Sequence, residues 1–307
     1  MTTQKAVIIT EPKKIGLFTD RPIPALQDDY ILVRTVSVGL NPTDWKHVAF
    51  LSPRCAGGDI KKPFKKGNCV CGFTHGANAV QPEDGAFAEY IVAKGDLQIK
   101  IPDNMSFQDA ATLGASINTL ALPTEPMKKA APILIYGGST VTGTLAIQFA
   151  KISRYTVLRT CSPHNFNLIR NQTKNNLKLA LDYISLEASA KFCNKAIFSE
   201  GREYSTLLDM KIEYANVNNC FTLAYTTAGE AFNFSDIQFL AKLEDQAHSK
   251  KFIMIAESLL SEGKVKVHPP MVGKGGLNDV IEELQLLKED KVSKEKLVYN
   301  IAKTLNI

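Results

Sequence analysis

The chain has 307 residues, 45% of them hydrophobic and 22% charged, and a net charge of +5. This composition is ordinary for a soluble globular protein and sufficient for a buried core. The densest basic stretch, KKPFKKG (61–67), is too short for a nucleic-acid patch, and no apolar run approaches the length of a membrane span. We therefore expect neither nucleic-acid nor membrane binding.

Cysteine usage and the N-terminal stretch bear on the compartment. The six cysteines form no paired C-x-x-C units, and MTTQKAVIITEPKK lacks the basic-then-apolar pattern of a signal peptide. Reduced thiols fit this usage better than a disulfide framework. The expectation is a soluble, cytoplasmic protein.

The first part of the chain is predicted to be rich in strands. KAVIIT (5–10), YILVRTVSVGL (30–40) and FAEYIVAK (87–94) combine β-branched and aromatic residues with partial alternation. Gly and Pro punctuate the stretches between them.

From Pro132 onward the sequence predicts alternating strands and helices. ILIY (133–136) is a wholly apolar strand of the kind buried in parallel sheets, and TLAIQFAKIS (144–153) has apolar residues at helical spacing. The pattern continues with a strand at 156–161, a strand at 177–185 and a helix at 187–197. This alternation indicates a βαβ series.

After Asp245 the pattern changes again. Helices are predicted at 246–260 and 277–290, followed by a final strand at 295–301.

The stretch YGGSTVTGTLAIQFAK (136–151) has the spacing G-x-T-x-x-G between a strand and a helix. Gly138 is predicted to make the tight turn and Gly143 to let the helix pack closely, while Thr140 replaces the glycine that usually admits a pyrophosphate. Hydroxyl groups and the helix N-terminus can still bind phosphate oxygens. The predicted cradle consists of Gly138, Ser139, Thr140, Val141, Thr142 and Gly143. A glycine-rich turn without a ligand is the alternative.

The second strand of the series is followed by no acidic residue before Asp182. An Asp or Glu at this point would hold the ribose 2′-hydroxyl of NAD. Ser162, His164 and Asn165 can instead donate to a 2′-phosphate, so the sequence predicts NADPH. Ser162 could alternatively cap a helix, and the direction of the Arg159 side chain stays open.

Four stretches carry further motifs: VGLNPTDWKHV (38–48), the segment 83–114, the segment 133–151 and EDKVSKEKLVYNI (289–301). Together they resemble the medium-chain dehydrogenase/reductase superfamily. They are most similar to its zinc-free fungal branch of trans-acting enoyl reductases and quinone-reductase-like proteins.

The resemblance implies an α/β fold with two domains. A GroES-like β-barrel domain would comprise residues 1–122 and 245–307. A Rossmann NADP(H)-binding domain with a doubly wound parallel sheet would comprise residues 123–244, with the active site in the cleft. NADPH would deliver a hydride to a C=C bond next to a carbonyl, in an enone or enoyl thioester, or to a quinone. The resemblance also implies a small-molecule substrate and a monomer or homodimer.

Individual site residues follow from the same resemblance. Asn41 and Lys46 match positions near the nicotinamide and its ribose, and Lys46 is expected to contact the cofactor or the carbonyl. Thr112 belongs to a segment that lines the cleft and is a second candidate catalytic residue. The segment KLV (296–298) matches a strand that approaches the cofactor, with Leu297 and Val298 as the expected cofactor contacts, although barrel packing is the alternative reading.

No zinc site is expected. The zinc-dependent relatives place a Cys where Pro42 or Thr43 stands and carry a Gly-His-Glu further on, and this chain has neither.

Relative to the family pattern, the chain is shortened after HVAFLSP, after NTLALP and after NLIRNQTKN. The last loss removes a Rossmann strand, so the sheet is expected to lack one strand at an edge. Two functions therefore stay open: the NADPH-dependent reductase, and a catalytically impaired or non-catalytic nucleotide-binding remnant with an incomplete fold.

Overall fold

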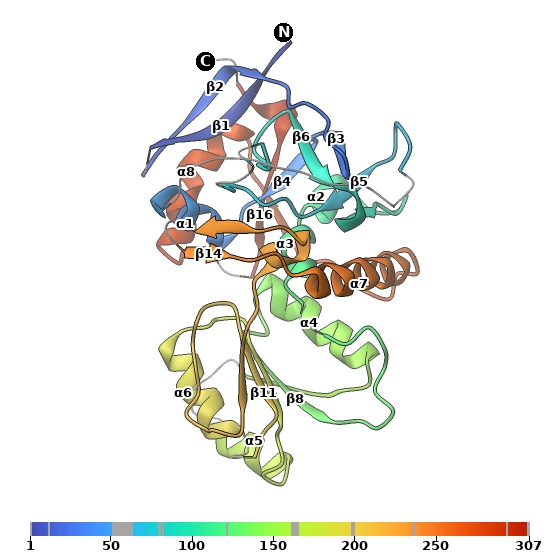
Figure 1. Cartoon of the computed structure of the whole chain (residues 1–307), viewed down its shortest axis with the longest axis vertical. Helices are drawn as coiled ribbons and strands as arrows, with labels where there is room; N and C mark the ends of the chain where they lie inside the picture. The colour runs from blue at the N-terminus through green and yellow to red at the C-terminus, as the bar shows by residue number, and fades with distance from the viewer. Residues whose placement is uncertain are drawn as a thin grey trace. The chain divides into compact units, whose positions relative to one another are not determined.

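The computed structural model describes residues 2–11, 13–50, 64–78, 81, 83–120, 122–160, 166–197, 200–234, 237–292 and 294–305. The chain folds into two compact units (Figure 1). Unit 1 comprises Met1–Asn118 and Tyr225–Ile307, and unit 2 comprises Thr119–Ala224. Among the described residues, every helix is too short or too polar to cross a membrane.

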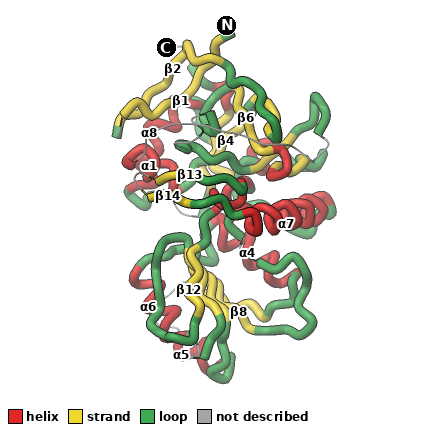
Figure 2. The backbone as a smooth tube through the Cα atoms, in the orientation of Figure 1, coloured by secondary structure: helices red, strands yellow, loops and turns green. Residues whose placement is uncertain are grey.

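Unit 2 is built on a five-stranded parallel sheet (Figure 2). Its strands are β8 (Pro132–Tyr136), β9 (Thr156–Thr160), β10 (Leu179–Asp182), β11 (Glu203–Thr206) and β12 (Asn218–Phe221). They lie in the order β12-β11-β10-β8-β9. In the described part of the chain no strand pairs with the outer side of β9, as the shortened sequence led us to expect. The strand order reverses at β8, because β9 lies on one side of it and β10 to β12 lie on the other. Such a switch point between neighbouring strands, here β8 and β10, is where α/β sheets bind nucleotides.

Helices cover both faces of this sheet. Helix α4 (Val141–Ile152) joins β8 to β9, and α5 (Phe166–Gln172) and α6 (Glu187–Ala196) follow β9 and β10. Helices α5 and α6 share one apolar cluster with Tyr204 of β11. Helix α4 lies on the face of the sheet opposite to α5 and α6. Crossovers between parallel strands are right-handed, and β9 is added on one side of β8 while β10 and the later strands are added on the other side, so the connecting helices fall on opposite faces.

The end of β10 differs from the prediction for a physical reason. The strand was expected to run to residue 185, but it stops at Asp182. The Asp182 carboxylate accepts hydrogen bonds from the backbone N–H groups of Ile184 (3.0 Å) and Ser185 (2.9 Å). This local capping turns the chain out of the sheet.

Unit 1 is a set of short, mostly antiparallel sheets. The pairs are β1 (Thr3–Glu11) with β2 (Lys14–Pro22), β3 (Tyr30–Arg34) with β6 (Tyr90–Lys94), β5 (Val70–Gly72) with β7 (Gln98–Lys100), and β13 (Phe232–Phe234) with β14 (Ile237–Phe239). A three-stranded sheet contains β15 (Pro270–Val272), β16 (Lys296–Asn300) and β4 (Ser37–Gly39) in that order. The helices are α1 (Pro42–Phe50), α2 (Phe107–Ala110), α3 (Gly114–Asn118), α7 (Leu243–Ser261) and α8 (Leu277–Lys288).

The predicted strand region 30–40 forms two strands with different partners, β3 on β6 and β4 on β16. Neither β2 nor any strand between residues 198 and 244 was predicted from the sequence. The strands found in that interval are only three or four residues long, and EYST and NNCF are largely polar, so they give almost no periodic signal.

The pairing of β4 with β16 joins the two sequence segments of unit 1. Val38 of β4 and Tyr299 of β16 are register partners, and both pack with Leu277 and Leu284 of α8 in one buried cluster. This cluster places the start of β16 beside the start of α1, which builds the site described next.

Candidate functional site

The turn between β8 and α4 in unit 2 is formed by close backbone contacts. Gly137 takes a φ of +80°, and a Cβ atom on Gly143 would lie 2.2 Å from the Gly137 carbonyl oxygen. The expected role of Gly143 in close helix packing therefore has a steric basis. The left-handed φ in this turn belongs to Gly137, one position before Gly138, the residue that was expected to make the tight turn.

Thr140 closes this turn. Its hydroxyl donates to the Gly137 carbonyl oxygen (2.9 Å) and accepts from the Gly143 N–H (3.0 Å), so it caps α4. The hydroxyl hydrogen is thus used within the turn. The donors that stay available to an anion are the exposed Ser139, the half-buried Thr142 and the first backbone N–H groups of the helix.

Arg159 lies beside the turn. A Cβ atom on Gly138 would be 3.6 Å from the Arg159 Cβ, and the Arg159 side chain is exposed. The structure thus answers the question of its direction, because the side chain lies on the turn side of β9. Ser162, His164 and Asn165 fall outside the described residues.

Asp182, at the carboxyl end of β10, does not serve as a free acid. Besides its two backbone donors, it accepts a hydrogen bond from the Tyr204 hydroxyl at 2.9 Å, and both side chains are almost fully buried. The carboxylate is saturated by these donors and holds the end of the sheet together.

Unit 1 contains a cavity of about 1390 Å³. Much of its wall is apolar, from β1, β3 and β6. One part of the wall is polar and combines residues from widely separated segments. This polar wall consists of Asn41, Thr43, Asp44, His47, Thr112, Tyr225 and Lys296.

The first group on the polar wall is Asn41, Asp44 and Lys296. The Lys296 Nζ donates to Asn41 Oδ1, and the Asn41 N–H donates to Asp44 Oδ2 at 2.6 Å. Burial raises the pKa of Asp44 to about 6, although the Asn41 bonds and the Lys296 charge act in the opposite direction. Burial lowers the pKa of Lys296 to about 8, against the attraction of Asp44. These groups therefore titrate close to neutral pH.

The second group is aromatic. The Tyr225 hydroxyl and His47 Nε2 are 3.0 Å apart, and the His75 ring lies 4.3 Å from the Tyr225 ring. Burial lowers the pKa of His47 to about 4. Burial, with a smaller contribution from His47, lowers the pKa of His75 to about 3. Both imidazoles are neutral at neutral pH.

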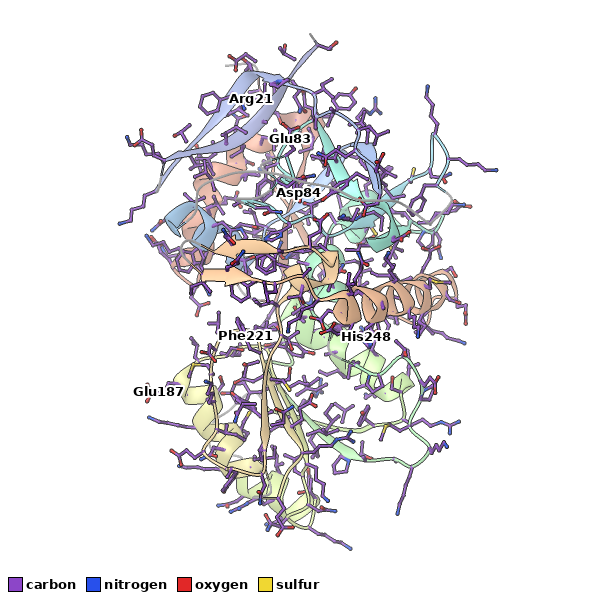
Figure 3. The ribbon with its side chains drawn as sticks, viewed as in Figure 1. Arg21, Glu83, Asp84, Glu187, Phe221 and His248 are labelled. Carbon is purple, nitrogen blue, oxygen red and sulfur yellow. The ribbon has the colours of Figure 1, made fainter. Side chains whose placement is uncertain are left out.

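A buried ionic cluster fixes the segment that follows Tyr225. Lys94 pairs with Asp29 and with Glu230, each at 2.6 Å, and lies over the Tyr30 ring. Asp84, labelled in Figure 3, is buried next to this cluster, and burial raises its pKa to about 7. Glu230 is thereby held against β3 and β6, and Tyr225 is held at the cavity.

The residues predicted from the family resemblance differ in position. Asn41 and Thr112 line the cavity, and the buried Thr112 hydroxyl donates to the Asp109 carbonyl oxygen at 2.7 Å. Lys46 is half-buried, its Nζ lies 5.6 Å from the centre of the Trp45 ring, and it is not among the residues of the cavity wall. Burial lowers the pKa of Lys46.

Leu297 and Val298 lie in the core of unit 1. Both side chains are buried. Their carbonyl oxygens accept hydrogen bonds from Leu40 N (3.0 Å) and Gly273 N (2.9 Å), so they are used for sheet pairing. This arrangement agrees with the barrel-packing alternative.

Four residues of the polar wall were not predicted as site residues: Thr43, Asp44, His47 and Tyr225. Thr43, Asp44 and His47 stand inside a stretch whose motif was recognised, so position within a motif was the available signal. Lys296 was predicted only as part of the strand that approaches the cofactor. Tyr225 had no signal, because only the tertiary structure brings it to α1. Among the described residues, no group of three or more His, Cys, Asp or Glu side chains could hold a metal ion.

Comparisons with known proteins find relatives along most of the chain. It is 51% identical over 282 residues to trans-enoyl reductase TOXD of Cochliobolus carbonum, with 78% of this chain and 95% of the relative covered. It is 37% identical to trans-enoyl reductase resD of Aspergillus sclerotiorum over 357 aligned positions, with 97% of this chain and 100% of the relative covered. That alignment is longer than this chain, so the relative has positions without a counterpart here. No family model matches the chain.

The solved structures show the fold. An alcohol dehydrogenase superfamily protein from Novosphingobium aromaticivorans superposes with a TM-score of 0.74 at 17% identity, covering 97% of this chain and 99% of that one. The predicted architecture, a GroES-like barrel with a Rossmann sheet, is confirmed.

Proposed function

We propose that this chain, which belongs to the trans-enoyl reductases of the medium-chain dehydrogenase/reductase superfamily, uses NADPH to reduce the C=C bond of an enoyl thioester or enone, or a quinone. The observation that carries the proposal is the intact turn between β8 and α4. It is shaped by a close contact that a Cβ on Gly143 would destroy, and it follows β8, one of the two strands at the sheet's switch point.

The turn fits a dinucleotide. Ser139, Thr142 and the first N–H groups of α4 would hold the pyrophosphate, and Gly143 brings the helix close enough for them to do so. Val141 begins the helix, and Thr140 holds the turn closed. We assign nucleotide binding to unit 2 (Thr119–Ala224), which overlaps the predicted domain 123–244.

The preference for NADPH rests on charge. The exposed guanidinium of Arg159 lies at the carboxyl end of the second strand, where a carboxylate would repel a 2′-phosphate. We propose that Arg159 binds this phosphate together with Ser162, His164 and Asn165.

When bound, NADPH supplies the hydride. The chain's own residues bind and orient the reactants and exclude water from them. We propose that Asn41, Lys46 and Thr112 contact the nicotinamide ribose or the substrate, and that β16, with Leu297 and Val298, supports this region. The apolar part of the unit 1 cavity would accept the hydrocarbon portion of the substrate.

The test separates binding from turnover. NADPH fluorescence is titrated with purified protein, and NADPH consumption is then measured with the crotonyl thioester of N-acetylcysteamine, an enone and a quinone. We expect saturable NADPH binding, preferred over NADH, and turnover with at least one substrate. Gly138→Asp should abolish both, because it places a carboxylate against the phosphates.

A folded wild-type protein that leaves NADPH fluorescence unchanged would contradict the proposal. Binding without turnover on any substrate would instead favour the nucleotide-binding remnant. That alternative is motivated by the positions of the longer relative that this chain lacks.

A further inference from the structure

We propose that Lys296 binds the carbonyl oxygen of the substrate and stabilises the enolate that forms when the C=C bond is reduced. This inference rests on the proposed function and assigns a catalytic role to a residue that was expected only to belong to a strand near the cofactor.

Lys296 is held rigidly at the cavity wall. It begins β16, its backbone N–H donates to the Pro269 carbonyl oxygen at 2.9 Å, and only 6% of the residue is exposed. Its aliphatic stem packs on β4, where a Cβ atom on Gly39 would lie 3.1 Å from the Lys296 Cε. The ammonium group thus has a fixed position rather than a solvated one.

The ammonium has unused hydrogen-bond donors. It carries three N–H groups, and within the described residues Nζ has one acceptor, Asn41 Oδ1. Asp44 attracts it electrostatically, but the two form no direct ion pair in that part of the chain. A buried charge with two unmatched donors is costly unless another acceptor is supplied. Because Lys296 lines the cavity, a substrate oxygen can be that acceptor.

The chemistry of the reduction matches this donor. Hydride addition to Cβ moves the π electrons of the C=C bond toward the carbonyl, and the oxygen gains negative charge. The Lys296 N–H donates to that oxygen and stabilises the charge where it develops. A proton from solvent then adds to Cα, and the C=O bond re-forms.

The charged and titratable groups around Lys296 come from two directions. Asp44 of α1 favours the ammonium form, and the Lys296 charge in turn contributes to lowering the pKa of the buried His268, just before β15. Ala111 and Thr112 contribute no charge. With a pKa of about 8, lowered by burial, Lys296 loses its proton as the pH rises through this value. Substrate activation should therefore decline above about pH 8.

The experiment compares wild type, Lys296→Met and a control, Lys303→Met, which removes an exposed lysine of the same C-terminal segment. The expected result for Lys296→Met is a loss of kcat of about 100-fold, with the Kd for NADPH unchanged within about twofold. The alkaline decline seen in wild type should disappear from the residual activity. Equal kcat in Lys296→Met and wild type would overturn the inference.

A second measurement needs neither turnover nor NADPH. The acetoacetyl thioester of N-acetylcysteamine forms an enolate that absorbs in the near ultraviolet. Wild-type protein at pH 7 should increase this absorbance over that of the free thioester, and the increase should vanish above about pH 8. An increase equally large in Lys296→Met, or one in wild type that persists to pH 9.5, would overturn the inference.

The two readouts keep this inference distinct from the proposed function. If wild type binds NADPH but turns over no substrate, the proposed function fails, and the enolate measurement alone decides on Lys296. If Lys296→Met does not fold, the pH dependence of the wild-type enolate signal still supports or contradicts the role.

Discussion

The turn of unit 2 and the polar wall of unit 1 are built in different ways. The turn is continuous in sequence: Gly137, Thr140 and Gly143 contact one another within seven residues. The polar wall draws on α1, the segment after α2, the start of β16 and the residue Tyr225. The first is fixed by backbone sterics, and the second by packing between distant segments.

This difference teaches where each part is vulnerable. A local turn fails when a single atom is added, because the backbone has no room to move. The polar wall is assembled from distant segments. It is disrupted by substitutions that remove one of its charged groups or the contacts that hold these segments together.

The largest effect is expected from Gly143→Val. Its Cβ would meet the Gly137 carbonyl oxygen at 2.2 Å, so α4 must separate from the turn. Unit 2 should lose at least about 3 kcal/mol of unfolding free energy, measured by chemical denaturation. The control is Gly76→Ala, where an added Cβ has nothing within 4 Å. A loss below about 1 kcal/mol in Gly143→Val would show that the turn is adaptable.

Tyr204→Phe tests the carboxyl end of the sheet in unit 2. It removes the buried hydroxyl that donates to Asp182 and leaves one carboxylate oxygen without this donor. We expect a loss of about 2 kcal/mol in unfolding free energy. Tyr214→Phe, which lies at the edge of the same apolar cluster, is the control and should change stability by less than about 0.5 kcal/mol.

His75→Phe tests the pH dependence of unit 1. The folded pKa of His75, lowered by burial to about 3, lies below the unfolded value, so the unfolded state binds a proton as the pH falls through about 6.5. Wild type should therefore lose stability to this group between about pH 6.5 and pH 3, by about 1 to 2 kcal/mol at pH 5.

A comparison of wild type with His75→Phe isolates the contribution of His75 to the pH dependence of stability. Asp44 and Asp84 also titrate in this range, but they are present in both proteins and their effects cancel in the difference. The difference in unfolding free energy between wild type and variant should shift in favour of the variant as the pH falls from 7 to 5. An unchanged difference would mean that His75 is protonated in the folded protein.

The smallest effect is expected from Arg159→Ala. The guanidinium next to the turn should contribute about tenfold to the preference for NADPH over NADH, equivalent to about 1.4 kcal/mol. Fluorescence titrations with both nucleotides measure the ratio of the two Kd values. Arg154→Ala, an exposed arginine at the end of α4, is the control. If Arg159→Ala does not change this ratio of Kd values, Arg159 does not bind the 2′-phosphate.

Much of the architecture could be predicted from the sequence. The helices 187–197 and 277–290 and the strands 133–136 and 295–301 were placed within two residues of their observed bounds, because strong periodicity or a continuous apolar run defines them. The short strands β11 to β14 could not be predicted. Three or four residues carry no period, and their pairing depends on neighbours far along the chain.

The sequence by itself determined the turn. The turn depends on local properties of the sequence: the glycine spacing, the capping threonine and the absence of a carboxylate after the second strand. Steric contacts between residues close in sequence fix its shape. The positive φ of Gly137 was not predicted, because the fingerprint spacing begins one residue later, at Gly138. Only the tertiary structure decided the polar wall, because Lys296 and Tyr225 lie more than 170 residues from Asn41 and His47. Their pKa values follow from burial, and burial belongs to the packed chain rather than to any segment of it.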